Sequence, residues 1–234
     1  MRKIGVFGKD SRHVRLYEQK LRKAGFETGL KGSDMTISLG GDGTYLLAER
    51  KFPGIPKLLV RDSHVCYNCD ERFNVDDVDS IIEKIAKKEY RIRPKSKLEA
   101  VFNHKPMTCV NDLSIRNKNA WEAIRFGVKV DGKAIHKELI GDGVVVSTPF
   151  GSTGYYHSIT RKSFSKGIGI AFNNSTILVK PLLLPENSVI TITITRGVAE
   201  LTTDNDPKTK IFRNGASVVI RKKKKSNASL VSLK

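Results

Sequence analysis

The chain reads Met35-Thr36-Ile37-Ser38-Leu39-Gly40-Gly41-Asp42-Gly43-Thr44-Tyr45-Leu46-Leu47-Ala48 across the stretch that decides the fold of its first half. The first five residues form an apolar run typical of a buried strand, the glycines then turn the chain, and Tyr45 begins a helix. Glycines at such a turn let backbone N–H groups approach a phosphate closely, and the helix N-terminus adds positive potential. The stretch therefore predicts a phosphate-binding turn at the end of a strand.

Asp42 is the unusual member of this turn, because a carboxylate would repel phosphate if the turn were only a cradle. It suits a base that accepts the proton of an attacking hydroxyl, or a ligand of Mg²⁺. The alternative is a tight turn whose aspartate caps the next helix. The chain has neither a Gly-x-x-x-x-Gly-Lys-Ser/Thr loop nor a Gly-x-Gly-x-x-Gly turn after its first strand. An ordinary P-loop kinase and a dinucleotide-binding dehydrogenase are thereby excluded.

Strands and helices alternate on both sides of this turn. Residues 4–7 and 57–60 read as further short buried strands. Asp10 or Ser11 can cap a helix that runs to Ala24, and residues 78–85 repeat apolar side chains at helical spacing. Strand–helix–strand units at this spacing predict a parallel sheet with helices on its faces. We assign this α/β domain to residues 1–93.

The hydrophobic pattern changes after Pro94, where few segments have apolar residues at helical spacing. Asp131-Gly132 is a strong hairpin signal between two strand candidates. We predict a second, mostly β domain over residues 94–234, whose last ~25 residues pack back on the first domain. The strand candidates are residues 98–102, 107–115, 123–130, 133–139, 144–147, 177–179, 189–195, 199–203, 216–220 and 230–233.

Two further stretches carry polar groups suited to a nucleotide. Residues 141–155, Gly-Asp-Gly-Val-Val-Val-Ser-Thr-Pro-Phe-Gly-Ser-Thr-Gly-Tyr, end a strand in a turn whose hydroxyls could hold a ribose or a phosphate, and Tyr155 could stack on a ring. Asn111-Asp112 places an amide beside a carboxylate, which suits two vicinal ribose hydroxyls. A plain turn rich in serine and glycine, and an Asx turn, are the structural alternatives.

Taken together, these motifs resemble the NAD kinase family. The order is Gly-Gly-Asp-Gly-Thr at 40–44, Asn111-Asp112, Gly-Asp-Gly at 141–143 and Thr-Pro-x-Gly-Ser-Thr-x-Tyr at 148–155. The resemblance covers residues 36 to 185 and implies a Rossmann-like α/β domain, a β-sandwich-like domain and a site in the cleft. It also implies transfer of the γ-phosphoryl of ATP, with Mg²⁺, to the 2′-hydroxyl of the adenosine ribose of NAD. The stretch 60–69 departs from the family's glycine-containing pattern there.

The resemblance also implies the roles of individual residues. Asp42 is the catalytic base. The NAD-binding residues are Asp42, Gly43, Asn111, Asp112, Asp142, Thr153, Gly154, Tyr155 and Ser158. The residues that bind the phosphates of ATP are Gly40, Gly41, Gly43 and Thr44. No metal site made of protein side chains is assigned, and family members are homo-oligomers, so we expect a homodimer or homotetramer.

Composition leaves other functions open. With 42 lysines and arginines against 24 acids, the net charge of +18 attracts polyanions. One rival is a lipid or sphingoid-type kinase that shares the Gly-Gly-Asp-Gly-Thr turn; another is a non-catalytic basic protein that binds nucleotides or nucleic acid. We expect no specific nucleic-acid partner, because only residues 221–225 form a continuous basic run, which reads as solvated chain beside a final strand. The phosphoryl donor could also be polyphosphate.

The cysteines and the hydropathy suggest the compartment. Three cysteines, an odd and low count, argue against a disulfide scaffold and for a reducing cytoplasm. His64-x-Cys66-x₂-Cys69 has the spacing of half a zinc site but no second pair, so a loop with buried thiols is the prediction. No apolar stretch approaches the length that spans a bilayer, so we expect no membrane partner.

Overall fold

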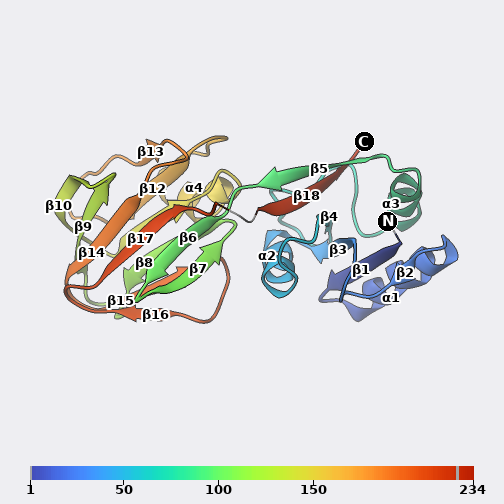
Figure 1. Ribbon diagram of the computed structural model, residues 1–234, viewed down its shortest axis with the longest axis horizontal. Coiled ribbons are helices and arrows are strands. Elements are labelled where there is room, and N and C mark those ends of the chain that lie inside the picture. The colour runs from blue at the N-terminus through green and yellow to red at the C-terminus, as the bar shows by residue number, and fades with distance from the viewer. Residues whose placement is uncertain (1, 225–226) are drawn as a thin grey trace. The chain divides into compact units, whose positions relative to one another are not determined.

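The computed structural model describes residues 2–224 and 227–234. The chain divides into two compact units (Figure 1): residues 1–95 together with 227–234, and residues 96–226. The chain therefore leaves the first unit once and returns to it with residues 227–234, and not with the whole of the last ~25 residues as predicted. Lys225, the last lysine of the basic run, lies outside the described residues.

The first unit is built on one sheet in the strand order β2-β1-β3-β4-β18-β5. Strands β1 to β4 and β18 run parallel to their neighbours, and only β5 is antiparallel to β18. This is the predicted parallel sheet, and its central strand β3 is buried at every position. The strands are β1 (Lys3–Gly8), β2 (Glu27–Thr28), β3 (Met35–Gly40), β4 (Lys57–Arg61), β5 (Tyr90–Lys95) and β18 (Ala228–Leu233).

Among its described residues, the first unit has the helices α1 (Ser11–Lys23), α2 (Asp42–Lys51) and α3 (Val78–Ala86). The side chain of Asp10 caps α1 by accepting the N–H of Arg12 at 2.7 Å, as its sequence predicts. Tyr17 and Leu21 of α1 pack in the core with the apolar side chains of α3 and the sheet. Helix α2 begins at Asp42 and not at Tyr45, so Asp42 stands in the first helical turn.

The second unit is a sandwich of two antiparallel six-stranded sheets, in the orders β10-β9-β14-β17-β6-β7 and β13-β12-β11-β8-β15-β16. Alternate residues of both sheets, such as Phe126 and Val146, meet in one buried core. The turn Asp131-Gly132 has φ of 50° and 81°, as a two-residue hairpin requires. The bounds are β6 (Leu98–Phe102), β7 (Lys105–Cys109), β8 (Asp112–Asn117), β9 (Ile124–Val130), β10 (Lys133–Gly141), β11 (Gly143–Ser147), β12 (Ile168–Asn173), β13 (Leu182–Leu184), β14 (Ile190–Arg196), β15 (Ala199–Thr203), β16 (Lys210–Phe212) and β17 (Ser217–Lys222).

Two strand predictions are wrong. Residues 107–115 form two strands, β7 and β8, because the N–H groups of Val110 and Asn111 turn toward the Asp204 carboxylate. Residues 177–179 form no strand: Leu178 is 97% exposed, and a short apolar run without a neighbouring strand has no partner for its backbone groups. Strand β12, which pairs with β11, was not predicted.

The basic run is not free solvated chain over its first residues. Arg221 and Lys222 belong to β17, where Arg221 pairs with Glu99 at 3.1 Å and Lys222 pairs with Glu186 at 2.8 Å. These cations are thus used within the fold. Among the described residues, no helix is long and apolar enough to cross a membrane.

Candidate active site

The glycine turn joins the carboxyl end of β3 to the N-terminus of α2. Gly40 has a φ of 151°, and a Cβ at this position would collide with the side chain of Thr44. Gly41 precedes the helix, and its carbonyl accepts the N–H of Thr44 at 3.0 Å. A side chain at either glycine would collide with neighbouring atoms, so both positions require glycine. The turn also presents backbone N–H groups at the start of a helix, where anions bind. Gly43 is exposed there and Thr44 is buried.

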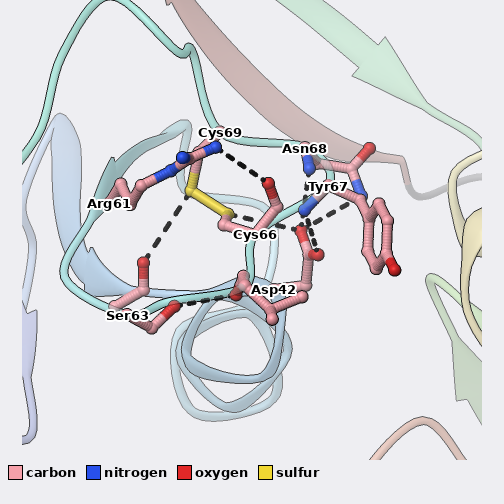
Figure 2. The surroundings of a disulfide bond; sticks show 9 residues. Asp42, Arg61, Ser63, Cys66, Tyr67, Asn68 and Cys69 are labelled. Atoms are coloured by element: carbon pink, nitrogen blue, oxygen red, sulfur yellow. Dashed lines mark hydrogen bonds between the residues drawn. A yellow bond between two sulfur atoms is a disulfide. The ribbon is translucent and has the colours of Figure 1, made fainter.

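The carboxylate of Asp42 is held by the loop that follows β4 (Figure 2). Its Oδ2 accepts the N–H of Tyr67 at 2.8 Å. Its Oδ1 accepts the backbone N–H of Asn68 at 3.2 Å and the side-chain amide of Asn68 at 3.1 Å. Asp42 is thus fixed by a neighbouring loop, and its role as a cap of its own helix is not seen, because α2 has no side-chain cap bond.

Cys66 and Cys69 form a disulfide, with their Cα atoms 5.5 Å apart. The prediction of two buried thiols in this loop is therefore wrong. The turn of residues 66–69 brings the two Cα atoms within the range that a disulfide spans, which cysteine counting alone does not reveal. Among the described residues, no group of three or more histidine, cysteine or acidic side chains is placed to hold a metal ion.

The Asn111-Asp112 pair enters β8 in the second unit, against the turn before β16. The Asp204 carboxylate accepts the N–H groups of Val110, Asn111 and Asp112 at 3.0, 2.7 and 3.4 Å. The side-chain Oδ1 of Asn111 is buried and has no hydrogen-bond partner among the described residues. This oxygen is an acceptor available to a ligand, since buried polar atoms are normally paired.

The carboxyl groups of Asp112 and Asp204 both have raised pKa values. Burial, followed by the charge of Asp204, raises the pKa of Asp112 to about 7. Burial also raises the pKa of Asp204 to about 6, although the backbone N–H groups it accepts oppose this shift. Two acidic groups with raised pKa values, one at the start of β8 and one after β15, are typical of a functional site, and they are also found in structural networks.

The turn that follows β11 packs directly on the Asn111-Asp112 pair. Thr148 donates its hydroxyl to the carbonyl of Val110 at 2.5 Å, and its N–H bonds to the carbonyl of Asn111 at 2.8 Å. Gly151 lies so close to the Asn111 backbone that a side chain would collide with it. A Cβ on Gly154 would lie 3.8 Å from the Asn111 side-chain nitrogen and 3.9 Å from an Asp112 carboxylate oxygen. The Gly-Ser-Thr-Gly turn and the Asn-Asp pair therefore form one surface.

The remaining predicted residues lie along the short helix α4 (Tyr155–Thr160) and the strand ends beside it. Tyr156 of α4 packs on Val145 of β11, so the helix covers the outer face of that sheet. The hydroxyl of Tyr155 accepts from Asn173 at 3.2 Å, and Asp142 accepts from Asn174 at 2.7 Å.

Thr153, in the 3-10 turn η1 (Gly151–Thr153), is partly exposed. Ser158 does not present a free hydroxyl proton, since it donates to the carbonyl of Tyr155 at 2.7 Å.

The structure thus brings the predicted residues into two groups. Asp42, Gly43 and the phosphate-binding glycines are in the first unit, and residues 111–112, 142 and 153–158 are in the second. Sequence reasoning gave no role to Tyr67, Asn68 or Asp204. The departure of residues 60–69 from the family pattern marked the first two, and the acidic Asp204-Asn205-Asp206 stretch marked the third. Neither signal indicated which residue each would contact.

Comparison with known proteins agrees with this fold and these motifs. The family model of the ATP-NAD kinase C-terminal domain matches residues 110–231. An NAD kinase 2 of Oceanobacillus iheyensis is 36% identical over 154 residues, which are 59% of this chain and 54% of that relative. The chain therefore spans about half the length of that relative.

Solved structures show the same architecture. A yeast NADH kinase in complex with NADH superposes with a TM-score of 0.89 at 18% identity, covering 100% of this chain and 84% of that one. An NAD kinase from Archaeoglobus fulgidus in complex with ATP gives 0.83 at 20% identity, covering 98% and 93%. The α/β unit with a β-sandwich unit is the fold of NAD(H) kinases. The family model covers more than half of this chain, so the chain belongs to the ATP-NAD kinase family.

Proposed function

We propose that this chain transfers the γ-phosphoryl group of ATP to the 2′-hydroxyl of the adenosine ribose of NAD, forming NADP. The observation that carries the proposal is Asp42, a carboxylate fixed on a glycine turn at the N-terminus of α2 in a chain of this family. Phosphoryl transfer requires positioning and charge neutralisation more than covalent chemistry. A held carboxylate beside backbone N–H donors meets that requirement.

Asp42 is assigned the role of base for the 2′-hydroxyl. Its Oδ2 accepts the N–H of Tyr67, and a carboxylate oxygen has two acceptor sites. One site on Oδ2 is therefore left to receive the hydroxyl proton. The backbone N–H groups of the turn that carries Gly40, Gly41 and Gly43 are assigned to the phosphates of ATP, because this turn stands at the N-terminus of α2, where anions bind.

The second unit is assigned the recognition of NAD. Asn111 and Asp112 would hold the ribose hydroxyls or the adenine, with Thr153, Gly154, Tyr155 and Ser158 beside them and Asp142 toward the nicotinamide. The unpaired buried oxygen of Asn111 supports this assignment, because a ligand N–H or O–H would satisfy it. The contact of Gly154 with the Asn-Asp pair supports a single binding surface.

Magnesium is assigned as a companion of ATP. Mg²⁺ in kinases is bound mainly by substrate phosphates with one or two carboxylates and water. Asp42 is the carboxylate on the glycine turn, which fits an ion that arrives with the triphosphate. The bound ion would neutralise the charge of the phosphate oxygens.

We further propose that the protein is a homodimer or homotetramer in the cytoplasm. Exposed apolar side chains of the second unit support self-association: Trp121 is 86% exposed and Leu178 is 97% exposed. Light scattering on the purified chain measures the assembly directly, and a single monomer mass across a concentration series would contradict it.

The activity is tested by incubating the purified chain with NAD, ATP and Mg²⁺ and reading NADP with an NADP-specific dehydrogenase. Turnover that depends on all three components is the expected result. Parallel reactions with polyphosphate and with NADH identify the donor and the redox form of the acceptor. Absence of product in every combination would contradict the proposed function.

A further inference from the structure

The loop after β4 packs against the glycine turn. A Cβ on Gly41 would lie 2.8 Å from both the hydroxyl of Ser63 and the carbonyl of Val65, so the loop touches the turn over its backbone. The N–H of Asp62 bonds to the carbonyl of Gly40 at 3.2 Å. A movement of residues 62–69 would therefore displace the turn that carries Asp42.

The disulfide closes the part of the loop that donates hydrogen bonds to Asp42 (Figure 2). Cys66 and Cys69 enclose Tyr67 and Asn68, and these are the two residues whose backbone N–H groups donate to the Asp42 carboxylate. The Sγ of Cys66 lies 3.7 Å from Oδ1 of Asp42. Since the ring closed by the disulfide contains both donating peptide groups, it restricts the directions in which they point.

The bonds from this ring decide how the carboxylate is oriented. Oδ1 accepts two N–H groups of Asn68, and Oδ2 accepts one from Tyr67, so three donors fix the plane of the carboxylate. With Oδ1 filled, the remaining acceptor site of Oδ2 is the one left for a substrate hydroxyl. Misplacement of a reacting group by about 1 Å can lower a rate about 100-fold, so such an orientation matters for catalysis.

We propose that the Cys66–Cys69 disulfide is a redox-sensitive positioning element for Asp42, which holds the base while it is closed and releases it when it is reduced. This inference rests on the proposed function, in which Asp42 is the base. A dithiol reductant supplies two electrons and two protons: the S–S bond breaks, Cys66 and Cys69 become thiols, and the reductant closes to its own disulfide.

The surroundings of the loop suit such a change. Val65 and Tyr67 are 63% and 66% exposed, whereas Cys66 and Cys69 are 7% and 9% exposed, so a reductant reaches the disulfide when the exposed part of the loop moves aside. A small pocket of about 160 Å³ on the first unit is lined by Asn68 and Cys69, among others, and gives the opened loop room to rearrange. In a reducing compartment, disulfides that do occur are usually catalytic or redox-sensing.

The test compares the oxidised and the dithiothreitol-reduced full chain under anaerobic conditions, with Cys66→Ser/Cys69→Ser as a permanently open variant. We expect reduction to lower kcat about tenfold with a change in KM below about twofold, and the double variant to match the reduced enzyme in both states. Cys109→Ala, which removes the buried third cysteine of the second unit, is the matched control and should respond like the wild type.

Two readouts separate positioning from a general structural effect. In an Asp42→Asn background, reduction should cause no further loss of kcat, because the group being positioned has been replaced. Amide hydrogen exchange should show loss of protection at Tyr67 and Asn68 on reduction. Equal kcat in the two redox states of an active enzyme would overturn the inference.

The exchange measurement also keeps the two proposals apart. In a chain without kinase activity, loss of protection at Tyr67 and Asn68 would support the link between the disulfide and Asp42 while the proposed function failed. Retained protection after complete reduction, measured by thiol titration, would overturn the link itself.

Discussion

The carboxylate of Asp204 accepts the backbone N–H of Asn111 at 2.7 Å, although 93 residues separate them in the chain. The same carboxylate accepts from Val110, and the N–H of Asp204 donates to the carbonyl of Asp112 at 2.8 Å. Asp204 therefore holds the backbone of the Asn-Asp pair at the point where the chain passes from β7 to β8.

Replacement of Asp204 by alanine is expected to destabilise the protein by about 1–3 kcal/mol, because it leaves backbone N–H groups without an acceptor. The KM for NAD should rise more than kcat falls, since the proposed NAD-binding pair loses its support. Urea unfolding and steady-state kinetics measure the two effects. Asp204→Asn keeps one acceptor oxygen and should fall between the wild type and the alanine variant; an alanine variant with unchanged stability would contradict the role.

The raised pKa of Asp112 predicts that the stability of the protein depends on pH. Its folded pKa of about 7 lies above its ordinary value of 3.8, so the folded state holds a proton that the unfolded state has lost between these pH values. The stability of the wild type relative to Asp112→Asn should therefore fall as pH rises from about 4 to about 7, by at most about 4 kcal/mol, and then level off. Unfolding curves from pH 4 to 8 measure this difference, and a difference independent of pH would show that the shift is absent.

Asp42→Asn is expected to lower kcat about 100-fold or more while the protein stays folded and still binds nucleotide, as for loss of a general base. Asparagine keeps the size of the side chain and one acceptor oxygen for the N–H groups of Tyr67 and Asn68. Asp79→Asn, on an exposed carboxylate of α3, serves as the control and should leave kcat unchanged. Turnover like that of the wild type in the Asp42 variant would remove Asp42 from its assigned role.

The buried pair of Lys57 and Glu49 ties the C-terminal part of α2 to the start of β4. The Lys57 side chain is fully buried and donates to Glu49 at 2.5 Å and to the carbonyls of Phe52 and Ile55 at 2.7 and 2.8 Å. Lys57→Met should lower the free energy of unfolding by about 3–5 kcal/mol, because it leaves the buried carboxylate of Glu49 without its cation.

The double variant Glu49→Leu/Lys57→Met should recover part of this loss. Chemical unfolding of the single and double variants measures the coupling. A double variant whose loss equals the sum of the two single losses would show that the two charges do not interact.

Local features of the protein could be predicted from the residues alone. The apolar run of β3, the glycines before α2 and the Asp10 cap of α1 each depend on neighbours within a few positions, so their pattern is visible in the chain. The motif order also predicted the family, because the residues that approach phosphate and ribose leave little freedom of type. The β strands of the second unit were predicted less completely, and residues 177–179 show that an apolar run becomes a strand only beside a partner.

Contacts between distant segments were decided by the tertiary structure. The sequence alone determined the strand–turn–helix unit, the class of each domain and the position of the candidate base Asp42. It did not determine that residues 66–69 would close a disulfide against Asp42, that Asp204 would reach Asn111, or that β18 would return to the sheet of the first unit. Periodicity and propensity report which face of an element is buried, whereas the partner of that face is chosen by packing and by the pairing of backbone N–H groups across the whole chain.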